Sequence, residues 1–222
     1  IGDLDSYASF CSEIAAETGL PVVSVDYRLA PEHPFPAAPD DCEAAARWIA
    51  ASPGELGFKV SGLVTMGDSA GGNLTIVTTN ALIDEPAAAP LLAQVPIYPI
   101  AGPIAHHASF REFADGYFLT AEVMAWFTRC YAGDEEHPRN YPLLRDDHSR
   151  TPPTVVLTAG LDPLRDSGRE YVARLALQGV DVAHFEARGV IHGFVTMRKA
   201  IASTRADLQR VYGALKLMMG TE

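Results

Sequence analysis

Residues 63–72 read Leu-Val-Thr-Met-Gly-Asp-Ser-Ala-Gly-Gly, and this stretch decides the fold. Its apolar start predicts a buried strand, and the residues after the serine favour a helix. The bend between them carries the pattern Gly67-x-Ser69-x-Gly71, whose small residues let the strand and the helix approach closely. A serine at such a bend must adopt strained dihedral angles. The stretch therefore predicts a serine nucleophile; the alternative is a tight turn with a helix-capping serine.

The backbone N–H of Ala70 belongs to the first turn of the expected helix. The first N–H groups of a helix have no partner within it and attract negative charge. We therefore expect the Ala70 amide to face the oxyanion that forms when Ser69 attacks a carbonyl carbon.

A serine nucleophile needs a histidine base, and the histidine needs a carboxylate that orients it. In chains with this serine bend the acid and then the histidine follow the serine, each in a loop after a strand. Asp162 follows the apolar run 154–159, and His192 follows the run 182–187. Asp166 is the rival acid; we interpret it as a helix N-cap because Asp162 is nearer to the strand. The other histidines lie in a proline-rich loop, in the segment 100–153 or inside a strand: His33, His106, His107, His137, His148 and His184.

The remaining pattern alternates strands and helices. Apolar, β-branched runs predict strands at 21–27, 63–67, 91–98, 154–159 and 182–187. Helical periodicity predicts helices at 5–18, 40–51, 70–83, 120–131, 167–178 and 199–218. The alternation predicts an α/β fold, with a mostly parallel sheet and helices on both faces, in one domain over residues 1–222. The segment from about 100 to 153 is expected to be an insertion on the pocket side of the sheet.

The composition excludes several classes of partner. The chain has 222 residues and a net charge of −11, which disfavours nucleic acids and anionic membranes. No apolar stretch reaches transmembrane length. The three cysteines, Cys11, Cys42 and Cys130, are too few and too far apart for a disulfide framework or a zinc site, so we expect a reducing cytoplasm and no metal.

The substrate pocket is expected to be apolar, built from the insertion and from residues near the three catalytic candidates. Asp68, the residue directly before the serine, is a further candidate. The pocket candidates are Asp68, Tyr98, Phe118, Trp126, Ile191 and Phe194.

The motifs resemble those of the bacterial hormone-sensitive-lipase-like carboxylesterases (family IV), which are α/β-hydrolases. The resemblance rests on residues 25–38, on Gly-Asp-Ser-Ala-Gly-Gly-Asn at 67–73, on Asp-Pro-Leu-Arg-Asp at 162–166 and on Ile-His-Gly-Phe at 191–194. It implies that Ser69 is the nucleophile, Asp162 the acid and His192 the base. It also implies hydrolysis of short-to-medium acyl esters without a metal or an organic cofactor.

The resemblance further implies a homodimer formed through the strand 182–187 and the C-terminal helix. The apolar residues near the C-terminus are compatible with this interface, although packing in the core would explain them equally well: Leu215, Leu217, Met218 and Met219.

The chain departs from the family at its start. The family carries a His-Gly-Gly-Gly loop, whose amides supply most of the oxyanion hole, just upstream of the position that Ile1 occupies here. We expect a longer protein in which that loop, three strands and lid helices precede Ile1, and little hydrolysis without them. One of those strands would lie between 21–27 and 63–67. A secretion signal therefore stays open.

Three other functions remain as alternatives. The same three residues also cleave amides, so an amidase or peptidase is one of them. The second is a non-catalytic small-molecule receptor on the same fold, which the presence of His192 argues against. The third is a purely structural or interaction fragment.

Overall fold

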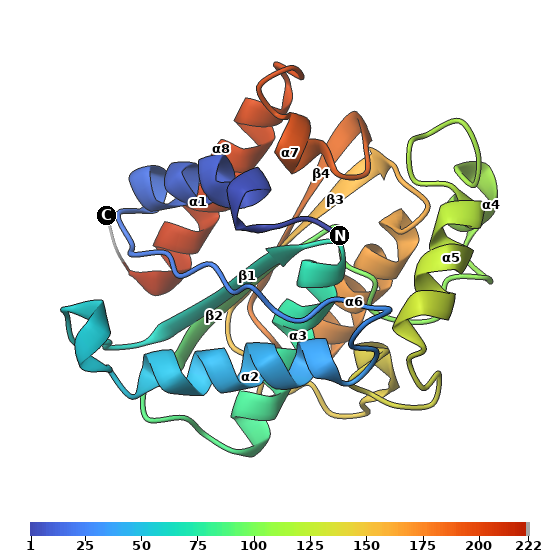
Figure 1. Ribbon diagram of the computed structural model, residues 1–222. Helices are drawn as coiled ribbons and strands as arrows, with labels where there is room; N and C mark the ends of the chain where they lie inside the picture. The colour runs from blue at the N-terminus through green and yellow to red at the C-terminus, as the bar shows by residue number, and fades with distance from the viewer. Residues whose placement is uncertain (221–222) are drawn as a thin grey trace.

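The computed structural model describes residues 1–220, and a parallel sheet forms its centre (Figure 1). Four strands lie side by side in the order of the sequence, with every neighbouring pair parallel. They are β1 (Leu63–Asp68), β2 (Leu91–Ile97), β3 (Thr154–Leu161) and β4 (Val182–Ile191). Because the strands are parallel, their carboxyl ends meet at one edge of the sheet, as the strand–helix alternation predicted.

Helices cover both faces of this sheet (Figure 1). One face packs against α1 (Leu4–Thr18) and α8 (Thr204–Met219), and the other against α3 (Ala70–Asp84) and α6 (Arg165–Leu177). Helix α2 (Ala37–Ala50) packs on α3, and the short α7 (Phe194–Met197) lies near α1. The segment between β2 and β3 contains α4 (Ala108–Glu112) and α5 (Ala121–Tyr131). Two 3-10 turns, Gly54–Leu56 and Pro142–Leu144, complete the elements.

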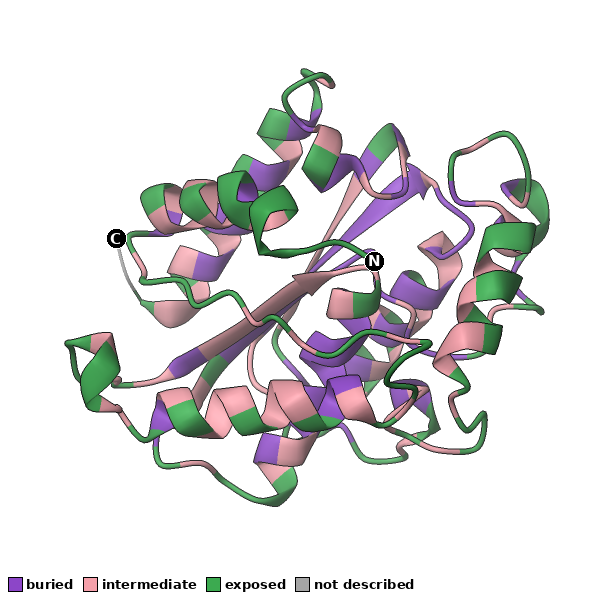
Figure 2. Cartoon of the chain, viewed as in Figure 1, coloured by how far each residue is buried: buried purple, intermediate pink, exposed green. Residues whose placement is uncertain are grey.

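The apolar core has two layers because successive side chains of a strand point to opposite faces of the sheet. In β3, Val155 and Leu157 belong to the cluster that includes Leu208 of α8, whereas Val156 belongs to the cluster that includes Tyr171 of α6. Val155, Val156 and Leu157 are all fully buried. Figure 2 shows buried residues concentrated in the inner strands β2 and β3, whereas β1 is mostly of intermediate burial. The helices that pack on both faces of the sheet hold in place the edge at which β1, β3 and β4 end.

The expected strand at 21–27 does not form, and this prediction was wrong. The segment is extended and mostly exposed, and within residues 1–220 no backbone hydrogen bond joins it to a neighbouring strand. A β-branched sequence favours an extended chain, but a strand also needs a partner for its N–H and C=O groups. Val22 and Val23 consequently remain 38% and 41% exposed.

Several helix boundaries also differ from the predictions. The helix expected at 199–218 begins only at Thr204, and the one expected at 40–51 begins at Ala37. Helix α6 begins at Arg165 rather than 167, so Asp166 lies in its first turn and Leu164 takes the N-cap position. The interpretation of Asp166 as an N-cap was therefore wrong. Among the helices of residues 1–220, none combines the length and apolar character that crossing a bilayer requires.

Candidate active site

Ser69 occupies the bend between β1 and α3. Its φ of 57° and ψ of −116° confirm the strained conformation that the sequence predicted. Its N–H donates to the carbonyl oxygen of Ile97 at 2.9 Å, which holds the bend against the end of β2. Ala70 is exposed and begins α3, so its N–H is one of the helical donors without a partner inside the helix.

Two glycines allow the close approach at this bend. A Cβ atom at Gly67 would overlap the backbone carbonyl of Gly71. A Cβ atom at Gly72 would lie 2.8 Å from the carbonyl oxygen of Ile97 and 3.1 Å from Cα of Pro99. At Gly71 itself a Cβ atom would meet nothing within 4 Å. The sequence assigned the second close approach to Gly71, but the structure gives it to Gly72.

His192 joins Ser69 to Asp162 at the carboxyl edge of the sheet. Nε2 of His192 lies 2.8 Å from Oγ of Ser69, and Nδ1 lies 2.7 Å from Oδ2 of Asp162. The second oxygen, Oδ1 of Asp162, accepts a hydrogen bond from the N–H of Leu164 at 2.8 Å. Asp162 is fully buried and His192 nearly so. Side chains from three strand ends, 30 and 123 residues apart along the chain, therefore form one hydrogen-bonded row.

Asp166 takes part in a different network. Its carboxylate accepts hydrogen bonds from the N–H of Ser109 and from the guanidinium groups of Arg165 and Arg169. Burial alone would raise the pKa of Asp166, but the bonds from Arg165 and Ser109 hold it below its usual value. The geometry thus brings Asp162, and not the rival Asp166, to His192.

Asp68 ends β1, directly before Ser69, and its side chain is bonded to two tyrosines. Its carboxylate accepts a hydrogen bond from the hydroxyl of Tyr98 at 2.8 Å and from that of Tyr7 at 3.3 Å. Burial raises the pKa of Asp68, and these hydrogen bonds oppose the rise. Tyr7 was not among the predicted site residues, because nothing in the helical pattern distinguishes it from an ordinary core residue of α1.

The other pocket candidates divide into three groups. Tyr98 and Phe194 are fully buried: the Tyr98 ring lies 4.6 Å from that of His192, and Phe194 packs on Tyr98 within the core. Ile191 ends β4 and is partly exposed beside His192. Phe118 is 65% exposed, and its ring would lie 3.2 Å from a Cβ atom at Gly193.

Trp126 is 47% exposed on α5, where its ring contacts Phe127. The structure therefore places the exposed Phe118 beside Gly193 and packs the buried ring of Tyr98 against His192. It leaves Phe194 in the core.

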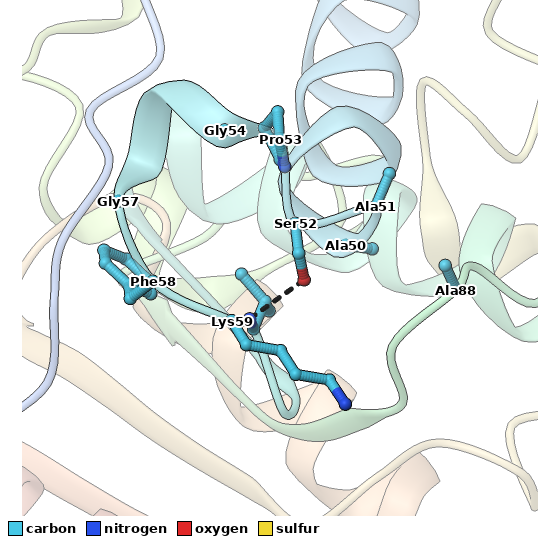
Figure 3. Close-up of a pocket in the computed structure, with 10 residues that line it drawn as sticks. Ala50, Ala51, Ser52, Pro53, Gly54, Gly57, Phe58, Lys59 and Ala88 are labelled. Atoms are coloured by element: carbon cyan, nitrogen blue, oxygen red, sulfur yellow. Dashed lines mark hydrogen bonds between the residues drawn. The ribbon is translucent and has the colours of Figure 1, made fainter.

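Two cavities of the structure lie at the opposite edge of the sheet. One has a volume of about 620 Å³ and lies between the end of α2 and the segment before β1, where Ser52, Phe58 and Lys59 line it (Figure 3). The other, of about 360 Å³, lies near the start of β2. Neither contains a residue of the Ser69–His192–Asp162 row. The chemistry therefore belongs to the carboxyl edge and not to these cavities.

Comparisons with known proteins agree with this geometry. A family described as the alpha/beta hydrolase fold matches residues 1–196. The chain is 36% identical to an ethyl acetate hydrolase of Pseudomonas putida, over 97% of this chain and 69% of that protein. It is 34% identical to the esterase LipI of Mycobacterium tuberculosis, over 99% of this chain and 69% of that protein.

One solved structure and one further relative are also similar to this chain. A hyperthermophilic esterase of the archaeon Pyrobaculum calidifontis superposes with a TM-score of 0.91 at 37% identity, over 98% of this chain and 71% of that one. The chain spans 52% of lipase 2 of Moraxella sp., to which it is 34% identical. The chain therefore belongs to the hormone-sensitive-lipase-like family of carboxylic ester hydrolases, on the α/β-hydrolase fold.

Proposed function

We propose that this chain carries the catalytic residues of a serine carboxylesterase that acts through an acyl-enzyme intermediate. The observation that carries the proposal is the pair of hydrogen bonds, 2.8 Å and 2.7 Å long, that link Ser69 to His192 and His192 to Asp162. A hydroxyl beside the free nitrogen of an imidazole, whose other nitrogen faces a carboxylate, is the arrangement that activates a serine.

The reaction proceeds in two halves. His192 takes the proton of Ser69 at Nε2 as Oγ attacks the ester carbonyl carbon, and Asp162 holds the proton of the ring on Nδ1. The oxyanion that forms is stabilised by the N–H of Ala70 together with further amide donors. His192 then gives its proton to the leaving alcohol, and water repeats the sequence on the acyl-serine.

Esters with short-to-medium acyl chains are the proposed substrates. A relative at 36% identity is named an ethyl acetate hydrolase, which supports a short acyl group. The net charge of −11 makes strongly anionic esters poor substrates. The segment 100–153 is proposed to shape the acyl side of the pocket, because Phe118 from this segment lies beside Gly193.

Ester hydrolysis by the Ser69→Ala variant of the full-length protein tests the proposal. We expect kcat for p-nitrophenyl butanoate to fall by roughly 10⁶ with folding intact. The matched control is Ser203→Ala, which removes an exposed serine before α8 and should leave kcat unchanged. Substantial turnover by Ser69→Ala would refute the proposal, and a faster reaction on the matched amide would favour the amidase alternative.

Association of two copies through β4 and α8 is a further part of the proposal. β4 is the last strand of the sheet in residues 1–220, and Leu217 of α8 is 83% exposed, whereas Leu215 is buried in the core. An exposed leucine beside an unpaired strand edge suits an interface between copies. Light scattering of the full-length protein should show a dimer that Leu217→Lys weakens; a monomer at all concentrations would refute it.

A further inference from the structure

Two histidines before α4 lie against a glutamate of α6. Nε2 of His107 lies 2.9 Å from Oε2 of Glu170, and Nε2 of His106 lies 3.8 Å from the same oxygen. One ligand atom from each of the three side chains lies within 4.8 Å of the others. The cysteine spacings predicted no metal site, whereas His107 and Glu170, 63 residues apart in the chain, meet only through the fold.

The spacing of these atoms suits a zinc-type ion. Ligand atoms about 2.0–2.1 Å from a tetrahedral ion lie roughly 3.4 Å from one another. The separations of 2.9 Å and 3.8 Å lie on either side of that value, so small rotations of the His106 and Glu170 side chains would complete the geometry. Two imidazole nitrogens and one carboxylate oxygen form a donor set that binds Zn²⁺ rather than Mg²⁺.

One ligand of this group is fixed and the other two can adjust. The side chain of His107 is 9% exposed, whereas those of His106 and Glu170 are 64% and 42% exposed. Nδ1 of His107 has no hydrogen-bond partner within residues 1–220, so the single proton of the neutral ring is free to sit there and leave Nε2 to an ion. The exposure of the other two side chains leaves room for water in the fourth position.

We propose that His106, His107 and Glu170 bind a divalent transition-metal ion of the zinc class, with water as the fourth ligand. His107 is the N-cap of α4, and Ser109 of α4 already bonds to Asp166 in the first turn of α6. The ion therefore fastens the start of the insertion to the helix that follows Asp162. Metal ligands are commonly supported by a hydrogen bond at the second ring nitrogen, which His107 lacks among residues 1–220, so we expect the affinity to be about 10–100-fold below that of a supported site.

The charges around the site both favour and oppose a cation. The net charge of −11 concentrates cations near the protein. Arg111 opposes binding, because its guanidinium donates to the backbone carbonyl of His106 at 3.1 Å. A soft ion bound by imidazole tolerates this neighbour better than a hard ion held only by carboxylates.

Titration of the metal-stripped full-length protein with zinc chloride tests the proposal. Calorimetry should show one ion per chain, and zinc should raise the thermal unfolding temperature, whereas magnesium chloride at the same concentration should not. His106→Ala and Glu170→Gln are the test variants, because both side chains are partly exposed and their loss leaves the core intact. Each should weaken zinc binding at least about tenfold.

The controls separate this site from other histidines. His33→Ala, which removes an exposed histidine of the proline-rich loop, should bind zinc as the unchanged protein does. Absence of zinc binding by the unchanged protein would overturn the proposal. So would binding that survives in both test variants, or binding that only His192→Ala removes. Because the readouts are heat and unfolding temperature, they do not depend on whether the chain hydrolyses esters.

Discussion

Replacing Asp162 by asparagine changes one atom of the carboxylate and should disable His192. In the structure Oδ1 accepts the N–H of Leu164, and Oδ2 faces Nδ1 of His192. The asparagine must keep its carbonyl oxygen toward the Leu164 N–H, because an amide NH₂ group there would face another donor. Its NH₂ group then faces His192 and donates to Nδ1. The imidazole proton is forced onto Nε2, where it points at Ser69 and cannot accept the proton of the hydroxyl.

A histidine held in the wrong tautomer lowers kcat by about 10⁴, or about 5.4 kcal/mol of activation free energy. The assay is the steady-state hydrolysis of p-nitrophenyl butanoate by the full-length protein, with circular dichroism to verify folding. Asp166→Asn is the matched control: it weakens a partly buried network with Arg165 and Ser109 that does not touch His192, and it should change kcat by less than about tenfold. The reasoning is refuted if Asp162→Asn retains more than a tenth of kcat, or if Asp166→Asn is the more damaging variant.

Three further outcomes concern stability. Gly72→Ala places a Cβ atom against the backbone and should lower the free energy of unfolding by about 1–3 kcal/mol in urea titrations. Gly71→Ala is the control and should not lower it, because a Cβ atom there meets nothing within 4 Å. Equal effects of the two substitutions would contradict the packing argument. Tyr98→Phe removes the hydroxyl that donates to Asp68 and should lower the same free energy by about 1–3 kcal/mol; an unchanged urea midpoint would show that this bond contributes nothing. Burial lowers the pKa of His148 below 6.5, so the unfolded chain binds more protons and stability falls as the pH drops below about 6.5. In urea titrations between pH 7 and 5, His148→Phe should reduce the loss of unfolding free energy that accompanies the falling pH. If the free energy of unfolding depends on pH as strongly as in the unchanged protein, the loss comes from other groups.

The sequence predicted the parts of the fold that local patterns determine. The strands β1 to β4 and the positions of Ser69, Asp162 and His192 after three of them followed from apolar runs, turn residues and the order of the catalytic types. The segment 21–27 was mispredicted as a strand because its β-branched pattern favours an extended chain, whereas a strand also needs a paired neighbour, and the neighbour expected between 21–27 and 63–67 is not part of residues 1–220.

Features that depend on three-dimensional contact escaped prediction. Tyr7 contacts Asp68, 61 residues away in the sequence, and His107 contacts Glu170, 63 residues away. No sequence spacing predicts either contact. Phe194 looked like a pocket residue because it follows His192 closely, yet the turn at Gly193 sends it into the core. Burial of an aromatic side chain is decided by the packing of whole elements, and sequence proximity to a site does not determine it.

Labelling with a fluorophosphonate tests the central claim most directly, because the reagent forms a covalent bond only with an activated serine. The account predicts one adduct per chain, located on Ser69 by peptide mass spectrometry. The adduct should be absent from Ser69→Ala and formed far more slowly in His192→Ala. An adduct on another residue, or ester hydrolysis by an unlabelled protein, would contradict the assignment of Ser69 and His192.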